Sequence, residues 1–537
     1  MHRTAAAFAL LSLSLAACGP AGAPSTGPRP ADTLRIGGPS AGTGRIERLV
    51  YQPVSPALPA IPAANGALAI RVIEPTPTTQ RPRSERTLIY GSVGTGQAAL
   101  EINGTAVPVA PNGAFLAYLP TPQDGAWRLR AQRGGEEVAQ TLEYARPATS
   151  TGAAGSGAAS QNAVYPTARA ATVTGGADTL ATGSDAIYAR PTPTGTYRWF
   201  FPRGARLNVV ERRGDQYRVQ LDGATEAWVD VRSLEVAETG APPAPAAVTA
   251  STTRAAEWTD LRVVAAGRPF LVEVTETGAV VTVYGATAAT VSGGGATGQA
   301  ANGSARITVP TGGMPWGYKA WYEANGDLVV RVRRPPAIDA ANPLRGRRIV
   351  IDPGHPPAGA TGPTGLYEGD ANLAIALPLA EKLRARGAEV ILTRTGREGL
   401  VSSTSSSEEL RARVQLAVDG NAELLVSVHN NAFGEGQDPF QMHGTSVYYF
   451  HPTSAGLAHA LDRAIVGVTQ IRDIGARVSN LALARPTWLP TALTESLFMP
   501  IPEQEAALRD PAFVERLADA HVAGIEAFLR ARAGGAR

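Results

Sequence analysis

Alternating apolar and polar residues, interrupted by glycine turns, dominate the first two thirds of the chain. Residues 98–109 alternate on both sides of Asn103-Gly104, and Asn112-Gly113 and Asp124-Gly125 mark two further turns. Asn-Gly and Asp-Gly pairs between alternating runs are typical of β-hairpins. The pattern therefore predicts a β domain over residues 34–147.

The same pattern predicts two more small all-β modules. Arg206–Glu211 and Tyr217–Leu221 alternate around a turn at Arg213-Gly214-Asp215, which indicates a module over residues 165–237. A third module, residues 254–337, has its clearest strands at 270–274 and 328–332. Between the modules, Gly, Pro, Ala, Ser and Thr predominate, as expected of linkers. This composition predicts a tether at 19–33 and linkers at 148–164 and 238–253.

The pattern changes after Arg347. Apolar runs at 348–351, 390–392 and 424–428 alternate with helical stretches at 370–386 and 408–418. Strands that alternate with helices of this length are typical of a layered α/β domain. We therefore predict a C-terminal α/β domain over residues 345–533, with a mostly parallel central sheet flanked by helices.

The N-terminal residues predict an export signal. Arg3 precedes an apolar run at residues 5–15 that is too short to span a bilayer, which is typical of a signal peptide. Leu15-Ala16-Ala17-Cys18 then resembles the bacterial lipobox, and Cys18 is the single cysteine of the chain. The resemblance implies a lipoprotein signal at 1–18, lipidation of Cys18 and a lipid-anchored protein of the cell envelope. The alternative is an ordinary secretory signal with an incidental cysteine.

Charge argues against nucleic acid as a partner. The formal net charge is +3 over 537 residues, without a basic stripe or a nucleic-acid motif. The sequence leaves the oligomeric state and the membrane that carries the anchor open.

Histidines point to a metal site in the C-terminal domain, because six of the seven follow residue 350. Asp352-Pro353-Gly354-His355 and Ser427-Val428-His429-Asn430 each end a predicted strand, and Glu368 precedes the first helix. Strand ends and helix starts meet at one rim of an α/β sheet. Two imidazoles and one carboxylate form the ligand set of hydrolytic zinc.

These segments resemble, in order and spacing, the zinc-ligand motifs of the N-acetylmuramoyl-L-alanine amidase family. Gly365-Leu366-Tyr367-Glu368 with Asn372-Leu373, Arg413, the strand 445–450 and Ala492–Glu495 match further family positions. The chain departs from the family at Pro356-Pro357, at Asn430 and at Ser496-Leu497. These departures affect the rim of the cleft and leave the ligand residues intact.

The resemblance implies a zinc hydrolase of peptidoglycan. Its ligands would be His355, Glu368 and His429, and Glu495 would act as general base on zinc-activated water. The bond cut would join the lactyl group of N-acetylmuramic acid to L-alanine of the stem peptide. Asp352 could hydrogen-bond a ligand imidazole, and Asn430 and Arg413 are further candidates for support or substrate contact.

The remaining polar candidates have simpler interpretations. Arg394 could meet a substrate carboxylate, although a structural ion pair is the simpler expectation. His459 and His521 lie in helical stretches and read as surface or core residues, whereas His443 and His451 flank a strand near the predicted site and could touch substrate.

The β modules also resemble known families. Residues 34–147 resemble a bacterial immunoglobulin-like sandwich, 165–237 a bacterial SH3 domain, and 254–337 occupy the place of an accessory β domain. The SH3-like module would bind wall peptides or serve as a spacer. Two rivals to the amidase remain: a non-catalytic wall-binding lipoprotein, and a zinc peptidase that acts on another envelope peptide.

Overall fold

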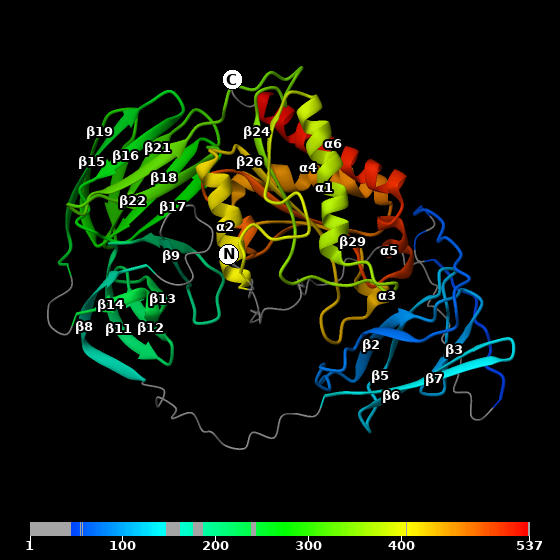
Figure 1. Ribbon diagram of the computed structural model, residues 1–537. Coiled ribbons are helices and arrows are strands. Elements are labelled where there is room, and N and C mark those ends of the chain that lie inside the picture. The colour runs from blue at the N-terminus through cyan, green and yellow to red at the C-terminus, as the bar shows by residue number, and fades with distance from the viewer. Residues whose placement is uncertain are drawn as a thin grey trace, which may run out of the picture.

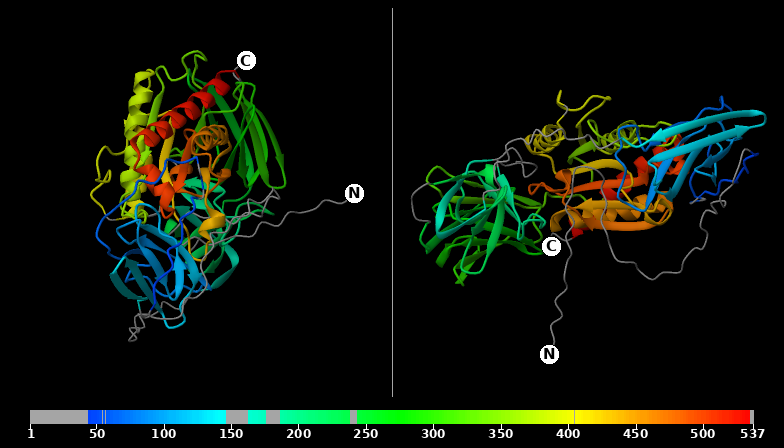
Figure 2. Two further views of the ribbon diagram at one scale, coloured as in Figure 1. Left: turned by 90° about the vertical axis from the view of Figure 1, so that its right-hand side faces the viewer. Right: turned by 90° about the horizontal axis from the view of Figure 1, so that it is seen from below.

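The computed structural model describes residues 44–145, 162–175, 186–237 and 243–534, except residues 54, 56 and 404. Cys18, the predicted signal and the tether therefore lie outside the described residues. Figures 1 and 2 show a central α/β domain with the first β module on one side and the other two on the opposite side.

The first β module consists of two antiparallel sheets that enclose one core. Trp127 and Phe115 are fully buried between the sheets. One sheet has the order β1-β2-β5 and the other β4-β3-β6-β7. The strands are β1 (Arg71–Glu74), β2 (Arg86–Ser92), β3 (Ala99–Ile102), β4 (Thr105–Val107), β5 (Ala114–Pro120), β6 (Ala126–Arg133) and β7 (Glu136–Glu143).

The second β module has a five-stranded sheet, β13-β12-β11-β8-β14, and a pair of strands, β10-β9. Its core includes Leu271 and Tyr284 of the third module, so the two modules share apolar packing. The elements are β8 (Ala163–Val173), β9 (Ala186–Ala189), β10 (Trp199–Pro202), β11 (Arg206–Arg213), β12 (Gln216–Gln220), β13 (Glu226–Asp230), the 3₁₀ turn η1 (Val231–Ser233) and β14 (Leu234–Val236).

The third β module packs a five-stranded sheet, β19-β15-β16-β23-β22, against a four-stranded one, β17-β18-β21-β20. The strands are β15 (Ala246–Arg254), β16 (Trp258–Val263), β17 (Phe270–Thr275), β18 (Gly278–Tyr284), β19 (Ala286–Ser292), β20 (Thr297–Ala301), β21 (Ser304–Pro310), β22 (Gly317–Tyr322) and β23 (Leu328–Arg333).

Two predicted linkers were wrong in part. Residues 246–253 lie in β15, where Val248 and Ala250 point into the core. Residues 163 and 164, at the end of the other predicted linker, begin β8. In both places small or isolated apolar residues alternate with polar ones, and their burial depends on sheet partners far along the chain.

The C-terminal domain is built on a six-stranded sheet of order β25-β24-β26-β29-β27-β28. The sheet is mixed, since four strand pairs are parallel and β27 runs antiparallel to β29. The strands are β24 (Arg348–Pro353), β25 (Glu389–Leu392), β26 (Leu424–Asn431), β27 (Thr445–Tyr449), β28 (Asp473–Val478) and β29 (Thr491–Phe498). The α/β prediction is confirmed, and two strands, β27 and β28, run opposite to the other four.

Helices cover both faces of this sheet. One face packs on α1 (Glu368–Ala385), α4 (Pro452–Thr469) and α6 (Pro511–Gly534), and the other on α2 (Ser406–Asp419) and the turn η2 (Ala482–Ala484). Two short helices, α3 (Pro439–Met442) and α5 (Pro502–Leu508), lie at the edge nearest the first β module (Figure 1).

The β modules contact the α/β domain directly. Tyr90 and Leu116 of the first module join Phe498 and Ile501 in one apolar cluster. Trp316 of the third module is fully buried in the α/β core, where its indole N–H donates to the Glu423 carbonyl at 2.6 Å. The α/β domain and its neighbours therefore share apolar surfaces.

Candidate metal centre

Three separate segments meet at the carboxyl ends of β24 and β26. His355 follows β24, Glu368 begins α1, and His429 lies near the end of β26. One Glu368 oxygen, Oε1, lies 3.0 Å from Nε2 of His355 and 3.2 Å from Nδ1 of His429. The three potential ligand atoms all fall within 4.8 Å of one another. The group therefore offers two nitrogen donors and one oxygen donor to a single metal ion.

Burial and neighbouring charges hold Glu368 and His429 in the forms that bind metals. Burial alone would raise the pKa of Glu368, but contacts with His355 and His429 lower it well below its ordinary value. Burial lowers the pKa of His429, which favours the neutral imidazole. Metal ligands must be deprotonated. The Glu368 carboxylate and the neutral imidazole of His429 meet that requirement.

Amide groups fix Glu368 on its remaining sides. The backbone N–H of Ala360 donates to Oε2 at 3.0 Å, and Nδ2 of Asn372 lies 3.3 Å from Oε1. Asn430 Nδ2 in turn donates to Asn372 Oδ1 at 2.9 Å. Asn430 is buried and faces this network. The Asn372 side chain, to which sequence reasoning gave no role, could have been found as the residue one helical turn after Glu368.

Gly354 makes room for the second imidazole. A Cβ atom at this position would lie 2.2 Å from Cε1 of the His429 ring. The next residue, His355, has φ of 60°. A left-handed backbone conformation in a residue other than glycine is strained and is common at functional sites. The close approach of backbone and ring requires glycine at residue 354.

A buried ion-pair network supports the first ligand loop. Arg413, on α2, donates to Asp352 at 3.0 Å, to Glu409 at 2.8 Å and to the His355 carbonyl at 2.9 Å. No hydrogen bond joins Asp352 to an imidazole among the described residues. Among the described residues, its carboxylate accepts from Arg413 and from the hydroxyls of Thr393 and Ser427. Asp352 therefore joins the end of β24 to α2.

Arg394 bonds backbone carbonyls, and the described residues show no ion pair of its guanidinium within salt-bridge distance. Its guanidinium donates to backbone carbonyls of Pro353 at 2.9 Å, Gly354 at 2.8 Å and Gly369 at 2.6 Å. It therefore joins the end of β24 to the first turn of α1.

Glu495 lies next to the metal group in the sheet. It is the register partner of His429 on the adjacent parallel strand β29. Register partners in parallel strands project from the same face, and neighbouring strands stand about 4.8 Å apart. Glu495 is 2% exposed. The carboxylate is thus buried on the face that carries His429.

Three further histidines of the described residues make structural contacts. His443 Nδ1 and His451 Nε2 each bond a backbone carbonyl at 2.8 Å. His521 is buried between the Leu517 carbonyl and the Thr494 hydroxyl, and His459 is exposed on α4. The suggested substrate contact by His443 and His451 has no support in these bonds.

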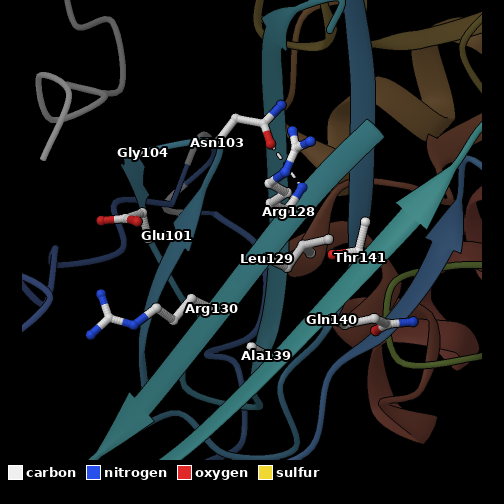
Figure 3. A pocket seen from close by; sticks show the side chains of 9 residues that line it. All are labelled: Glu101, Asn103, Gly104, Arg128, Leu129, Arg130, Ala139, Gln140 and Thr141. Atoms are coloured by element: carbon white, nitrogen blue, oxygen red, sulfur yellow. Dashed lines mark hydrogen bonds between the residues drawn. The ribbon is translucent and has the colours of Figure 1, made fainter. Parts of the chain in front are cut away.

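A hollow of about 460 Å³ lies elsewhere, on the outer face of β3, β6 and β7 (Figure 3). Arg130 at its edge forms an ion pair with Glu137 at 2.8 Å, and Arg128 forms one with Asp124 at 2.7 Å. These cations are already paired within the first module. The hollow is therefore not a candidate for the hydrolytic site.

Known proteins match the C-terminal part of the chain. A family model described as N-acetylmuramoyl-L-alanine amidase matches residues 349–527. The protein YqiI of Bacillus subtilis, called uncharacterized, is 30% identical over 199 residues, which cover 36% of this chain and 90% of that protein. The probable cell wall amidase LytH of Staphylococcus aureus is 29% identical over 219 residues, 40% of this chain and 68% of LytH.

Solved structures are similar to about a third of this chain. The catalytic domain of CwlV, an N-acetylmuramoyl-L-alanine amidase of Bacillus (Paenibacillus) polymyxa var. colistinus, is 31% identical. The match covers 33% of this chain and 96% of that domain, with a TM-score of 0.30.

The fold and the His-Glu-His group define a hydrolytic α/β amidase of the cell wall. The chain belongs to the N-acetylmuramoyl-L-alanine amidase family. It is therefore an enzyme whose substrate is peptidoglycan, and its place is the cell envelope or the outside of the cell. Among the described residues, no helix combines the length and hydropathy needed to cross a membrane.

Proposed function

We propose that His355, Glu368 and His429 hold one zinc ion at the catalytic centre. The observation that carries the proposal is the convergence of these side chains from three separate segments, within 4.8 Å of one another. Zinc bound there would polarise the scissile carbonyl and lower the pKa of water to about 7. The donor set, two imidazoles and one carboxylate, leaves a position for substrate or water, as in other catalytic zinc sites.

Glu495 is the proposed general base. It accepts a proton from the water that attacks the lactyl carbonyl carbon, and it returns the proton to the nitrogen of L-alanine as the amide C–N bond breaks. The products are the muramic acid carboxylate and a stem peptide with a free amine. The register of Glu495 with His429 across β26 and β29 supports its role as general base. Asp352, Asn430 and Arg413 position the ligand loops through the bonds described above.

Two substitutions separate binding from chemistry. Glu495→Gln keeps the shape of the side chain and removes the base, so zinc content should persist while turnover falls by about 10²–10⁴. His429→Ala should lose zinc and activity together. Metal analysis and hydrolysis of sacculi measure both. Near-normal turnover by Glu495→Gln would place the base on another residue.

The products distinguish the proposed bond from that cut by a peptidase. Mass spectrometry of digested sacculi should show intact stem peptides with free L-alanine amino groups. Stems shortened from within, with the muramic acid linkage intact, would establish the rival zinc peptidase.

Anchoring at Cys18 is a further part of the proposal. A single acyl chain gives only marginal membrane binding, so a stable anchor needs two or more chains. The Cys18→Ser variant should leave the membrane fraction and lose labelling by a fatty-acid analogue. Its activity on soluble muropeptides should be unchanged. Continued labelling would refute lipidation at this residue.

The β modules are proposed to hold the enzyme on the wall, the first as an immunoglobulin-like sandwich, the second as an SH3-like domain and the third as an accessory domain. The second module has a hollow of about 140 Å³ lined by residues that include Tyr188, Asp215 and Trp228. Asp215→Asn should weaken retention on purified sacculi, whereas Glu226→Gln, on β13 and absent from the lining, should not. Equal retention of the Asp215→Asn variant and the wild type would indicate that this module is a spacer.

A further inference from the structure

Three consecutive polar side chains of α5 are buried although the proposed chemistry does not use them. Glu503, Gln504 and Glu505 are 1%, 0% and 0% exposed. Removing a carboxylate from water costs free energy unless hydrogen bonds replace the lost hydration. Their partners therefore indicate what these side chains do.

Glu505 binds the loop that precedes Glu368. Its carboxylate accepts from the backbone N–H of Thr364 at 3.0 Å, from the Thr364 hydroxyl at 2.8 Å and from the backbone N–H of Leu366 at 3.0 Å. A Cβ atom at Gly362 would lie 2.6 Å from the Glu505 carboxyl carbon. The loop is thus folded around this carboxylate, and glycine at residue 362 permits the contact.

The same loop ends at the metal group. Thr361 and Tyr367 form an antiparallel bridge that closes it. Immediately beyond, the backbone N–H of Glu368 donates to the Ala360 carbonyl at 2.9 Å, and the Ala360 N–H donates to Glu368 Oε2 at 3.0 Å. A shift of the loop therefore moves the backbone of Glu368 and one of the bonds that orient its carboxylate.

We propose that Glu505 is a positioning residue that sets the place of the Glu368 ligand by serving as the template of the loop 361–367. The inference rests on the proposed zinc function of Glu368. Three donors converge on one buried carboxylate, and the loop they belong to leads directly into the ligand. Partners that orient metal ligands change metal affinity by about 10–100-fold when removed.

Glu503 supplies a matched control. It lies on the same short helix, is equally buried and also carries a carboxylate, but it accepts a hydrogen bond from Tyr51 near the first β module. Gln504 in between accepts from the backbone N–H of Phe498 at 2.7 Å. Glu505→Gln and Glu503→Gln therefore make the same chemical change on the same helix with different partners.

The experiment compares the full chain with both variants. Zinc affinity is measured by competition with a chromophoric chelator, and hydrogen–deuterium exchange of residues 360–368 is measured on the metal-free proteins. Glu505→Gln should weaken zinc binding about 10-fold and speed exchange of this loop. Glu503→Gln should leave both unchanged, even where its melting temperature falls.

The outcomes separate this inference from the proposed function. A wild-type chain that binds no zinc would refute the zinc site itself. Wild-type zinc affinity and loop exchange in a folded Glu505→Gln variant would refute the positioning role alone. Should Glu505→Gln fail to fold, Thr364→Val removes only the hydroxyl donor and should weaken zinc binding to a smaller extent. Unchanged affinity in that variant would likewise overturn the proposal.

Discussion

Replacing Gly354 with alanine should remove the metal site without altering any ligand. The added Cβ would lie 2.2 Å from Cε1, 2.4 Å from Nε2 and 2.6 Å from Nδ1 of the His429 ring. Carbon atoms in favourable contact are about 3.5–4.0 Å apart, so the ring must retreat by more than about 1 Å. Distances to a bound metal tolerate only about 0.2 Å. His429 would therefore cease to be a ligand.

The fold should survive this change. Glycine at 354 has no positive φ, so alanine fits the backbone, and the His429 side chain is 16% exposed and can turn toward the cleft. Overpacking of a protein interior costs about 1–3 kcal/mol of stability. Because the His429 ring can turn outward, we expect a cost near the lower end of that range. We expect zinc affinity and amidase activity to fall by more than about 100-fold, beyond the effect of losing an outer partner.

Zinc competition, hydrolysis of sacculi and thermal unfolding test this expectation on the full chain. Gly396→Ala is the matched control, because a Cβ there meets nothing within 4 Å. A Gly354→Ala protein that binds zinc as the wild type does would show that the imidazole is not held against this backbone, and would refute the geometry of the site.

Three further variants test the surrounding structure. Arg413→Met leaves two buried carboxylates without their cation, so the free energy of unfolding measured by denaturant titration should fall by about 3–5 kcal/mol. Arg397→Met, which removes an exposed ion pair, should change it by less than about 1 kcal/mol, and equal losses in the two variants would refute the network. Burial lowers the pKa of His521 to about 4, below its ordinary 6.5, so protonation favours the unfolded chain and the free energy of unfolding should fall as pH drops from 6.5 toward 4. His521→Gln should make that fall shallower, and an identical pH slope would show that His521 is not the group responsible. Trp316→Ala should lower the free energy of unfolding by about 3–5 kcal/mol in calorimetry, since the side chain is fully buried. A loss below about 1 kcal/mol would mean that the third module packs only weakly on the α/β domain.

The sequence predicts the convergence of the metal group because parallel strands end at one rim. His355 and His429 each follow a short apolar run, and Glu368 starts the intervening helix, so their proximity follows from the α/β pattern alone. Their roles, and that of Glu495, remain predictions.

Other features depend on packing that no local pattern contains. Asp352 binds Arg413 rather than a ring because α2 lies over that strand end, 61 positions away along the chain. β27 runs antiparallel to β29, and its residues alternate no differently from those of a parallel strand. β15 was read as linker because alanine and threonine give little hydrophobic signal, although Val248 is buried.

Because Trp316 is buried within the α/β core, the catalytic domain is poorly suited to being moved alone into another protein. A fragment cut at residue 340 would leave a vacancy beside Phe528, which stands 5.5 Å from the indole ring, and would expose Phe498 and Ile501 to water. Exposed apolar patches of this kind favour aggregation. A recombinant chimera should therefore carry the third module with the enzyme, and should also keep the first module or replace Phe498 and Ile501 with polar residues.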